Sequence, residues 1–258
     1  RYGTNSVQAA TVLAQGEMVG VKVAGGFGPV LFEPAQMTYL QQNPGAAITA
    51  IASGFADALL ADQLNTAVGC AVSAVENVAA LVNDVSASAG VTQVGLNNSH
   101  RKFGDMSSVL SADVMTGDVY HRLVGEAIAN SSSLFLSTNV KVVDILGKLF
   151  VISDIPALYE AGSPNKDKVL SITSGGIIVD NSSDIVSNME TSNGKLRIET
   201  TWQADYTFGV KLKGYAWDVA NGGASPTDAE LFTGTNWDKA VTDNKHTLGT
   251  LLIGSAAA

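Results

Sequence analysis

The stretch between Asn43 and Asp84 places the strongest limit on how this chain can fold, because it reads as one long amphipathic helix. Asn43 is a suitable N-cap, and Pro44 suits a first turn whose backbone N–H groups have no partners within the helix. Apolar residues then recur at the three- and four-residue spacing of one helix face. They are Ile48, Ile51, Phe55 and Leu59, followed by Val68, Val72, Val75, Val78 and Val82.

The length of this helix exceeds what a spherical molecule accommodates. An unbroken helix over the whole stretch is about 60 Å long at roughly 1.5 Å per residue. A compact chain of this size has a radius of gyration of only about 18 Å. Gly69 is the expected break, because glycine is a poor helix former. Even the part from Pro44 to Val68 would span roughly 37 Å.

A second long element is predicted between Lys195 and Lys213, where apolar and polar residues alternate. This two-residue period is typical of a strand with one face on a core and the other on water or a partner. The strand would reach roughly 57 Å at about 3.4 Å per residue, so we expect a bend near Gly209. The core face comprises Leu196, Ile198, Thr200, Trp202, Ala204, Tyr206, Phe208, Val210 and Leu212.

A long helix and a long strand together predict an elongated, plate-like subunit. Such a shape has much surface per unit of core, and that surface needs neighbours to cover it. The alternative is that either element is broken and the chain forms an ordinary compact globule. Periodicity alone is consistent with both.

Composition narrows the class of protein. The chain has 258 residues, of which 46% are hydrophobic and 15% charged, enough for one large or two modest domains. The net charge of −9 argues against a basic surface that grips nucleic acid, because such binding needs Lys and Arg on the phosphates. The most apolar window, Ala46 to Ala61, is short for a membrane span and contains Asp57, so we expect a covered helix and no membrane.

The residues that carry enzyme chemistry are sparse. Cys70 is the single cysteine, which excludes an internal disulfide and favours a buried thiol. The three histidines, His100, His121 and His246, have no cysteine or carboxylate at metal-ligand spacing. The chain also lacks a G-x-S-x-G motif. We therefore expect no catalytic residues, no metal site and no cofactor.

Residues 180–184, DNSSD, are faintly similar to the start of a calcium-binding loop. The sixth position of that loop would be Ile185 where glycine is needed, and the twelfth would be Thr191 where glutamate is needed. The sequence therefore favours a polar turn.

The remaining segments predict an α+β chain. Residues 1–16 are small and polar and suggest an extended arm that a neighbour orders. Residues 17–43 contain two apolar runs around Gly25-Gly26-Phe27-Gly28-Pro29, which predict a hairpin lying on another surface. The middle third alternates a helix capped by Thr92, a buried strand over 107–115, a helix after Asp118, and strands over 140–147, 148–154 and 169–180.

The three tryptophans have separate expected roles. Trp202 lies on the apolar face of the long strand, where a core position is the simplest interpretation. Trp217 and Trp237 flank a segment rich in Gly, Pro and Asn. They anchor either that loop or a subunit contact.

Several segments resemble the major capsid proteins of tailed bacteriophages with the HK97-type fold. The similar segments are SSVLSADVMTGDVYHRLVGEAI, ILGKLFVISDIPAL, and the long run from YTFGVKLKGYAWDVANGG to KHTLGTLLI. In the last run, the strings Ala-Trp-Asp and Asn-Trp-Asp-Lys are similar to the C-terminal region of one capsid subgroup. The resemblance covers most of the chain, and the elements follow that family's order.

The resemblance implies an HK97-like division of the chain. It comprises an N-terminal arm (1–16), a hairpin called the E-loop (17–43), a P-domain with the spine helix and long strand (44–90 and 180–208), and a mixed A-domain with the C-terminal segment (91–179 and 209–258). The E-loop of such proteins overlaps an adjacent subunit. The implied contact residues are Val21, Lys22, Val23, Phe27, Pro29, Leu31 and Phe32.

The function implied is a structural shell protein and not an enzyme. Many copies, as hexamers and pentamers, would form an icosahedral shell that encloses double-stranded DNA without reading its sequence. Portal, scaffolding or decoration proteins would be further partners. The location implied is the virion capsid, after assembly in the host bacterial cytoplasm. Lys22 is expected to be an ordinary surface lysine and not part of a covalent cross-link.

Two alternatives remain at the level of sequence. One is an encapsulin-like compartment of the same fold, which would enclose a cargo enzyme. The other is a monomeric α+β protein that binds a ligand or hydrolyses a substrate. The chain starts with Arg1, which we interpret as a product of proteolytic processing.

Overall fold

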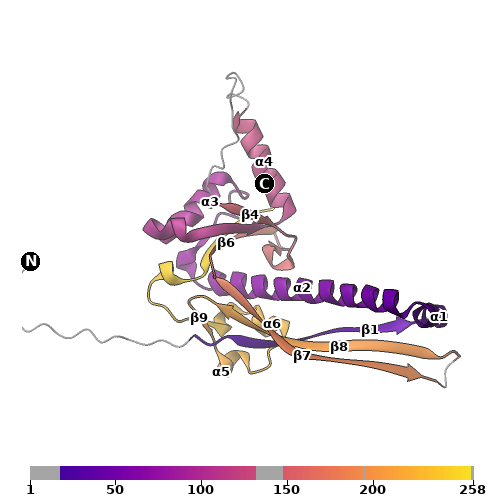
Figure 1. Cartoon of the computed structure of the whole chain (residues 1–258). Coiled ribbons are helices and arrows are strands. Elements are labelled where there is room, and N and C mark those ends of the chain that lie inside the picture. The colour runs from indigo at the N-terminus through magenta and orange to yellow at the C-terminus, as the bar shows by residue number, and fades with distance from the viewer. Residues whose placement is uncertain (1–17, 132–147, 194–195, 257–258) are drawn as a thin grey trace, which may run out of the picture.

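The protein has two lobes of different shape. The structure is a computed structural model and describes residues 18–131, 148–193 and 196–256. Figure 1 shows an elongated lobe, in which one long helix runs along three long strands, and above it a second lobe that contains the six-stranded sheet. We call the first lobe the arm and the second the body. The expected elongated subunit is what the structure contains.

Helix α2 (Pro44–Glu76) is the spine of the arm. It has 33 residues, which corresponds to about 50 Å. The predicted break at Gly69 is wrong, because the helix continues through this residue. A Cβ at Gly69 would lie 2.4 Å from the ring of Phe232, so glycine lets that ring pack against the helix. The helix ends earlier than Asp84, and the chain passes through a 3₁₀ turn (Ala79–Leu81) into strand β2 (Val82–Asp84).

The two ends of α2 have different environments. Near its C-terminal end, where body and arm meet, most residues of the helix are buried, whereas much of its N-terminal half is exposed. Cys70 lies in the buried part, and burial raises the pKa of its thiol to about 12, as expected for an inert thiol. Residues Thr49–Glu76 are long and apolar enough for a membrane span, but 56% of the most apolar window is buried inside the subunit. That burial is the behaviour of a core helix.

Strand β8 (Glu199–Leu212) is the centre of the arm's three-stranded sheet, whose order is β1-β8-β7. The predicted alternation is confirmed, and the strand passes Gly209 without interruption. Leu196 and Ile198 of the predicted face lie before the strand and are exposed. The buried side chains on the face toward α2 are Thr200, Ala204, Tyr206, Phe208, Val210 and Leu212.

The hairpin predicted within residues 17–43 is wrong. Strand β1 (Val21–Phe32) is one strand that pairs antiparallel with β8, from Val21 opposite Val210 to Phe32 opposite Thr200. The glycine-rich segment produces a bulge between Phe27 and Val30. Pairing along β8 and burial of apolar side chains outweigh the local turn preference of this segment. Helix α1 (Pro34–Gln42) then leads into α2.

The other neighbour of β8 is β7 (Ile177–Ser192), which is longer than expected. The strand predicted over 169–180 is two strands, β6 (Lys166–Thr173) and β7, separated by a turn. The predicted polar turn at 180–184 is also wrong. This run lies within β7, where the pairing register shifts between Asn181 and Ile185.

The body contains a six-stranded sheet with the path β2-β11-β6-β3-β4, and β5 pairs with β6. The predicted buried strand and both predicted helices are confirmed, and Thr92 caps the first helix by accepting a hydrogen bond from the N–H of Gly95. The strand predicted over 140–147 and the extended N-terminal segment predicted over 1–16 lie outside the described residues. The body elements are α3 (Gln93–His100), a 3₁₀ segment (Arg101–Val109), β3 (Leu110–Met115), α4 (Gly117–Ser131), β4 (Leu149–Ile152), a 3₁₀ turn (Pro156–Leu158), β5 (Tyr159–Glu160) and β11 (Gly249–Ser255).

Two tryptophans anchor the small elements below α2. The rings of Trp217 and Trp237 lie 5.0 Å apart, and both are buried. Each indole N–H donates to a backbone carbonyl, of Gly223 and Leu231 respectively. Of the two roles considered for this pair, the loop anchor is confirmed. The elements here are β9 (Tyr215–Trp217), α5 (Val219–Gly222), α6 (Asp228–Leu231), β10 (Trp237–Lys239) and 3₁₀ turns at Gly234–Asn236 and Asn244–His246.

A buried lysine joins the spine helix to the body. The Nζ atom of Lys168 in β6 lies 2.8 Å from a carboxylate oxygen of Glu76 and 2.8 Å from one of Glu160. Burial opposes the charged form of Lys168, but the hydrogen bonds to Glu160 and Glu76 outweigh it and raise the pKa of the lysine. Hydrogen bonds from Lys168 and Lys166 hold the pKa of Glu160 below its usual value. The ion pairs therefore fix the body on the end of α2.

This arrangement predicts a pH dependence of stability. A carboxylate with a lowered pKa contributes stability above its usual pKa, near 4.5, and loses it as the pH falls through the lowered value. We expect Glu160→Gln to be less stable than the natural protein at pH 7. The difference in the free energy of unfolding should shrink as the pH falls below about 4.5. Urea unfolding of both proteins across pH 3–7 measures the difference. A constant difference across this range would contradict the assignment.

Two glycines of α2 predict opposite effects of the same substitution. A Cβ added to Gly54 would have no atom within 4 Å, so Gly54→Ala should raise the free energy of unfolding by about 0.5–1 kcal/mol through helix propensity. Gly69→Ala should lower it by about 1 kcal/mol or more, because the Phe232 ring must move. Thermal unfolding of the two variants tests the pair. Equal stabilisation by both would show that the ring does not pack there.

Candidate assembly surfaces

The seven predicted contact residues all lie on β1, but they do not share one environment. Val21, Val23 and Phe32 are buried within their own subunit, so their side chains are not exposed to a neighbouring subunit in this structure. Phe27 is half-buried. The exposed members are Lys22, Pro29 and Leu31. Their role in contacts between subunits stays a prediction.

An aromatic cluster holds the outer part of the arm together. The ring of Phe55 on α2 lies 5.8 Å from Phe27, 5.9 Å from Trp202 and 5.9 Å from Tyr206, edge to face. The hydroxyl of Tyr206 donates to Asp62 on α2 at 2.8 Å, and its burial raises the pKa of this tyrosine. Edge-to-face rings contribute beyond their buried area. The cluster therefore fixes β1 and β8 against the helix.

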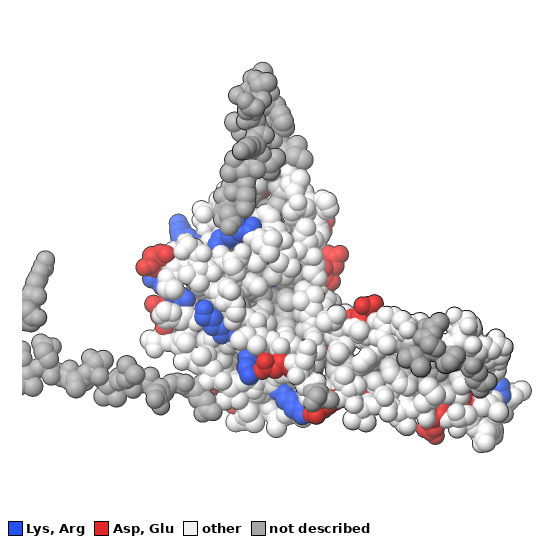
Figure 2. Space-filling model, in the orientation of Figure 1, with Lys and Arg blue, Asp and Glu red and all other residues white. Residues whose placement is uncertain are grey.

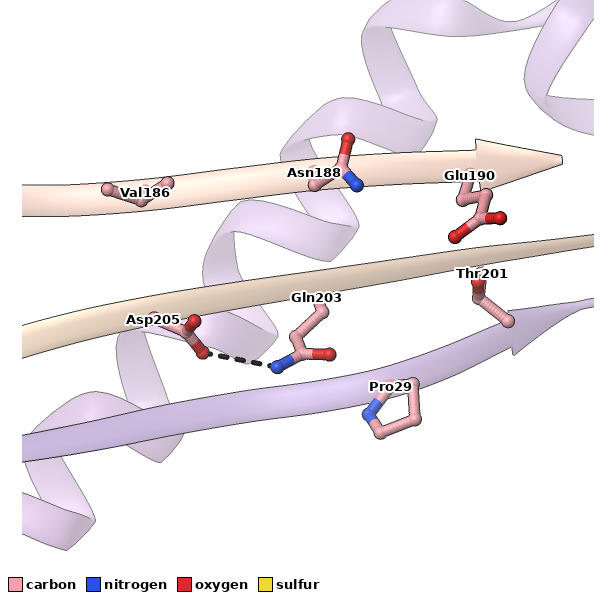
Figure 3. Close-up of a pocket in the computed structure, with 7 residues that line it drawn as sticks. All are labelled: Pro29, Val186, Asn188, Glu190, Thr201, Gln203 and Asp205. Carbon is pink, nitrogen blue, oxygen red and sulfur yellow. Dashed lines mark hydrogen bonds between the residues drawn. The ribbon is translucent and has the colours of Figure 1, made fainter.

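The sheet face turned away from α2 is polar and slightly hollow. Figure 3 shows side chains of all three strands around a hollow of about 260 Å³. The amide of Gln203 donates to Asp205 at 3.2 Å. Ion pairs of this sheet join Lys22 to Asp184 and Lys211 to Asp180. The lining residues are Pro29, Val186, Asn188, Glu190, Thr201, Gln203 and Asp205.

An apolar groove lies where α2, β7 and the body meet. Its volume is about 350 Å³. Leu60 and Leu64 of α2 form one wall of the groove, and both side chains are exposed. Ile177 and Val179 of β7 and Val151 of β4 form other parts of the lining. Exposed apolar surface of this kind is typical of an interaction site.

The outer half of β7 is exposed on both faces. Ile185, Val186 and Met189 have 52%, 70% and 54% of their surface exposed. Sequence reasoning missed these residues, because they follow the run that resembles a polar turn. The sequence did contain one signal for this strand, namely the apolar residues Ile185, Val186 and Met189 shortly after the strand predicted over 169–180.

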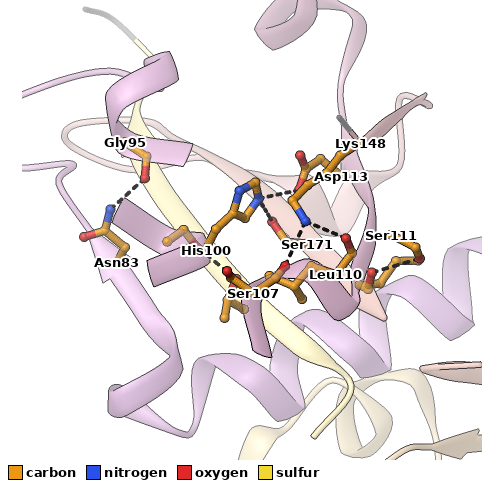
Figure 4. A network of polar contacts seen from close by, with 12 residues as sticks. Asn83, Gly95, His100, Ser107, Leu110, Ser111, Asp113, Lys148 and Ser171 are labelled. Atoms are coloured by element: carbon orange, nitrogen blue, oxygen red, sulfur yellow. Dashed lines mark hydrogen bonds and ion pairs between the residues drawn. The ribbon is translucent and has the colours of Figure 1, made fainter. Parts of the chain in front are cut away.

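A polar network lies inside the body (Figure 4). The Nε2 atom of His100 is 2.9 Å from Asp113 and 3.1 Å from the hydroxyl of Ser171. Nearby, the ammonium of Lys148 donates to the backbone carbonyls of Ser107 and Leu110, and burial lowers its pKa. A catalytic triad needs the serine and the carboxylate on different ring nitrogens, whereas here both face Nε2. The network joins α3, β3 and β6 and has the geometry of a structural core.

The charged side chains of the described residues are mixed in sign on the face in Figure 2. On the face in Figure 2, Lys and Arg lie in small groups with Asp and Glu, and charges are sparse along the arm. Among residues 18–131, 148–193 and 196–256, no group of three or more His, Cys, Asp or Glu side chains is placed to hold a metal ion.

Comparisons with known proteins agree with the resemblance seen in the sequence. A family model described as major capsid protein 13-like (Gp13-like) matches residues 1–251. Among solved structures, the capsid asymmetric unit of cyanophage Pam1 is 12% identical, with a TM-score of 0.54, and the match covers 100% of this chain and 83% of that chain. At this identity, the match to Pam1 shows the fold.

Two further solved structures match with lower TM-scores. The acid-stable capsid of Helicobacter pylori bacteriophage KHP30 is 6% identical, with a TM-score of 0.47 and coverage of 92% of this chain and 75% of that chain. A chain of Mycobacterium phage Che8 is 14% identical, with a TM-score of 0.42 and coverage of 74% and 66%. A search of curated proteins finds no match.

The match of the family model extends over nearly the whole chain, and the α+β fold is HK97-like. The matched residues, 1–251, therefore include the arm, the body and their junction. The chain belongs to the major capsid protein 13-like family and is a structural protein of a phage capsid shell.

Proposed function

We propose that copies of this chain assemble through their arms into hexamers and pentamers of an icosahedral shell. The observation that carries this proposal is the incomplete arm, in which α2 and β7 leave apolar side chains exposed along much of their length. Neighbouring copies bury this surface, and many weak contacts add up to a stable container. In this proposal β1 belongs to the E-loop (17–43), α2 and most of β7 and β8 belong to the P-domain (44–90 and 180–208), and the rest of the described chain belongs to the A-domain with the C-terminal segment.

The proposed content of the shell is double-stranded DNA, held without sequence-specific contacts. The net charge of −9 supports confinement without tight binding, because a strongly cationic lining would retain the DNA. Portal, scaffolding and decoration proteins are proposed partners, with assembly in the host bacterial cytoplasm. A cargo-enclosing compartment and a monomeric enzyme are less well supported, since the family is one of major capsid proteins.

The chain is proposed to have no enzymatic activity. The His100, Asp113 and Ser171 side chains, which have the residue types of a hydrolase, are 4% exposed or less. Their hydrogen bonds are made to each other. A substrate therefore has no access to the serine hydroxyl.

The two residues at the end of β1 provide a test of assembly. Leu31 is 44% exposed, whereas Phe32 is 8% exposed. We expect Leu31→Asp to leave the unfolding midpoint of the subunit unchanged and to reduce the yield of particles at least about tenfold, since it places charge in a subunit contact. Phe32→Asp should destabilise the subunit itself by about 3 kcal/mol or more.

The measurements are analytical ultracentrifugation and negative-stain electron microscopy of the purified chain and both variants. Shells or capsomers from the natural chain support the proposed function. A chain that stays a stable monomer at all concentrations, with or without added portal, scaffolding or decoration proteins, would contradict the proposed function. Normal particles from Leu31→Asp would remove β1 from the contact surface without affecting the rest of the proposal.

A further inference from the structure

The two edges of the arm's sheet differ in their protection. Along β1, Pro29 has no N–H group for a further strand, and a bulge interrupts the strand beside it. Strand β7 is the opposite edge and contains neither proline nor lysine. Its bulge lies between Asn181 and Ile185. The outer half, Ile185–Ser192, keeps regular pairing with β8 and has no such protection.

The outer half of β7 is also uncovered by the rest of the subunit. Every residue from Asp184 to Thr191 is exposed. Ile185 and Met189 lie opposite Tyr206 and Trp202, so they are on the sheet face that bears α2. The helix packs on β8 and β1 and leaves these two side chains exposed. A strand with apolar side chains in water on both faces is stabilised by a covering partner.

The apolar groove extends this surface toward the body. Ile177 and Val179 of β7 line the groove and lie on the same sheet face as Ile185, because their partners on β8 are the buried Leu212 and Val210. The side chain of Gln63 on α2 donates to Asn181 between the two parts, at 2.7 Å. The groove and the outer half of β7 therefore border the same side of α2.

We propose that β7 between Ile185 and Ser192 is a strand-addition site for an extended segment of a second copy of this chain. The added strand pairs with the outward N–H and C=O groups of β7, and its side chains cover Ile185 and Met189. The inference rests on the proposed function, because a shell supplies copies of the chain as neighbours. The described part of the same chain begins at Met18, next to β1, at the opposite edge of the sheet.

A pair of lysines tests this surface. We expect Ile185→Lys with Met189→Lys to reduce particle yield at least about tenfold, because lysine on an edge strand opposes the addition of a further strand. Both positions are exposed, so the unfolding midpoint of the free subunit should change by less than about 2 °C. The matched control is Val94→Lys on α3, which is 66% exposed and lies in the body. Normal assembly of the double variant would overturn the proposal.

Hydrogen exchange of the natural chain tests the same site without a substitution. The amides of residues 185–192 that point away from β8 should exchange at least about tenfold more slowly in particles than in dissociated subunits, because added hydrogen bonds protect them. Equal exchange in both states would overturn the proposal while leaving shell formation intact. Failure of the chain to form any particle would instead contradict the proposed function.

Cross-linking identifies the partner. A photo-crosslinking amino acid at Ser187, in particles made from isotopically light and heavy subunits, should give mixed light–heavy peptides. Peptides joined only within one chain, or to a different protein, would contradict addition by a second copy. The mixed peptides also identify which segment of the neighbour lies beside β7.

Discussion

The packing of α2 on the alternating face of β8 is the interaction on which the rest of the arm depends. Every second side chain of β8 faces the helix, and the central ones, including Tyr206, Phe208 and Val210, are buried. Burying one such side chain contributes about 1.5–3 kcal/mol. Because β8 is paired on both sides, it fixes the position of β1 and β7. The helix also contacts the inner half of β7, through Gln63 and Asn181 among others, and leaves the outer half of that strand exposed.

The body has internal charged and polar contacts, and it also exposes apolar side chains such as Leu149 and Ile152 of β4. In the body, the ammonium of Lys168 and the imidazole of His100 have partners inside the subunit. In the arm, apolar side chains of α2 and β7 remain exposed although they lie next to a core. In a shell, internal contacts such as those of Lys168 would hold each body together, and exposed apolar side chains would be available for contacts with neighbours.

The sequence predicted elements whose side chains follow one regular period. Strand β8 has a clear two-residue pattern because one of its faces is buried, and the helix at 44–76 was predicted from the spacing of its apolar residues, although its C-terminal part is buried on nearly all sides. The seven candidate contact residues were placed on a hairpin, but long-range pairing with β8 made their segment one strand. The outer half of β7 was not predicted, since a strand exposed on both faces has no alternation to detect. The end of α2 and the fit of Gly69 against Phe232 depend on tertiary contacts that local sequence does not contain.

The central claim is that copies of the chain complete the arm. An electron cryo-microscopy reconstruction of particles formed by this chain measures this directly, through the surface that each arm loses on assembly. Leu60 and Leu64 on α2, together with Ile185 and Met189 on β7, are predicted to be covered by neighbouring subunits. A shell in which these four side chains still face solvent would contradict the claim.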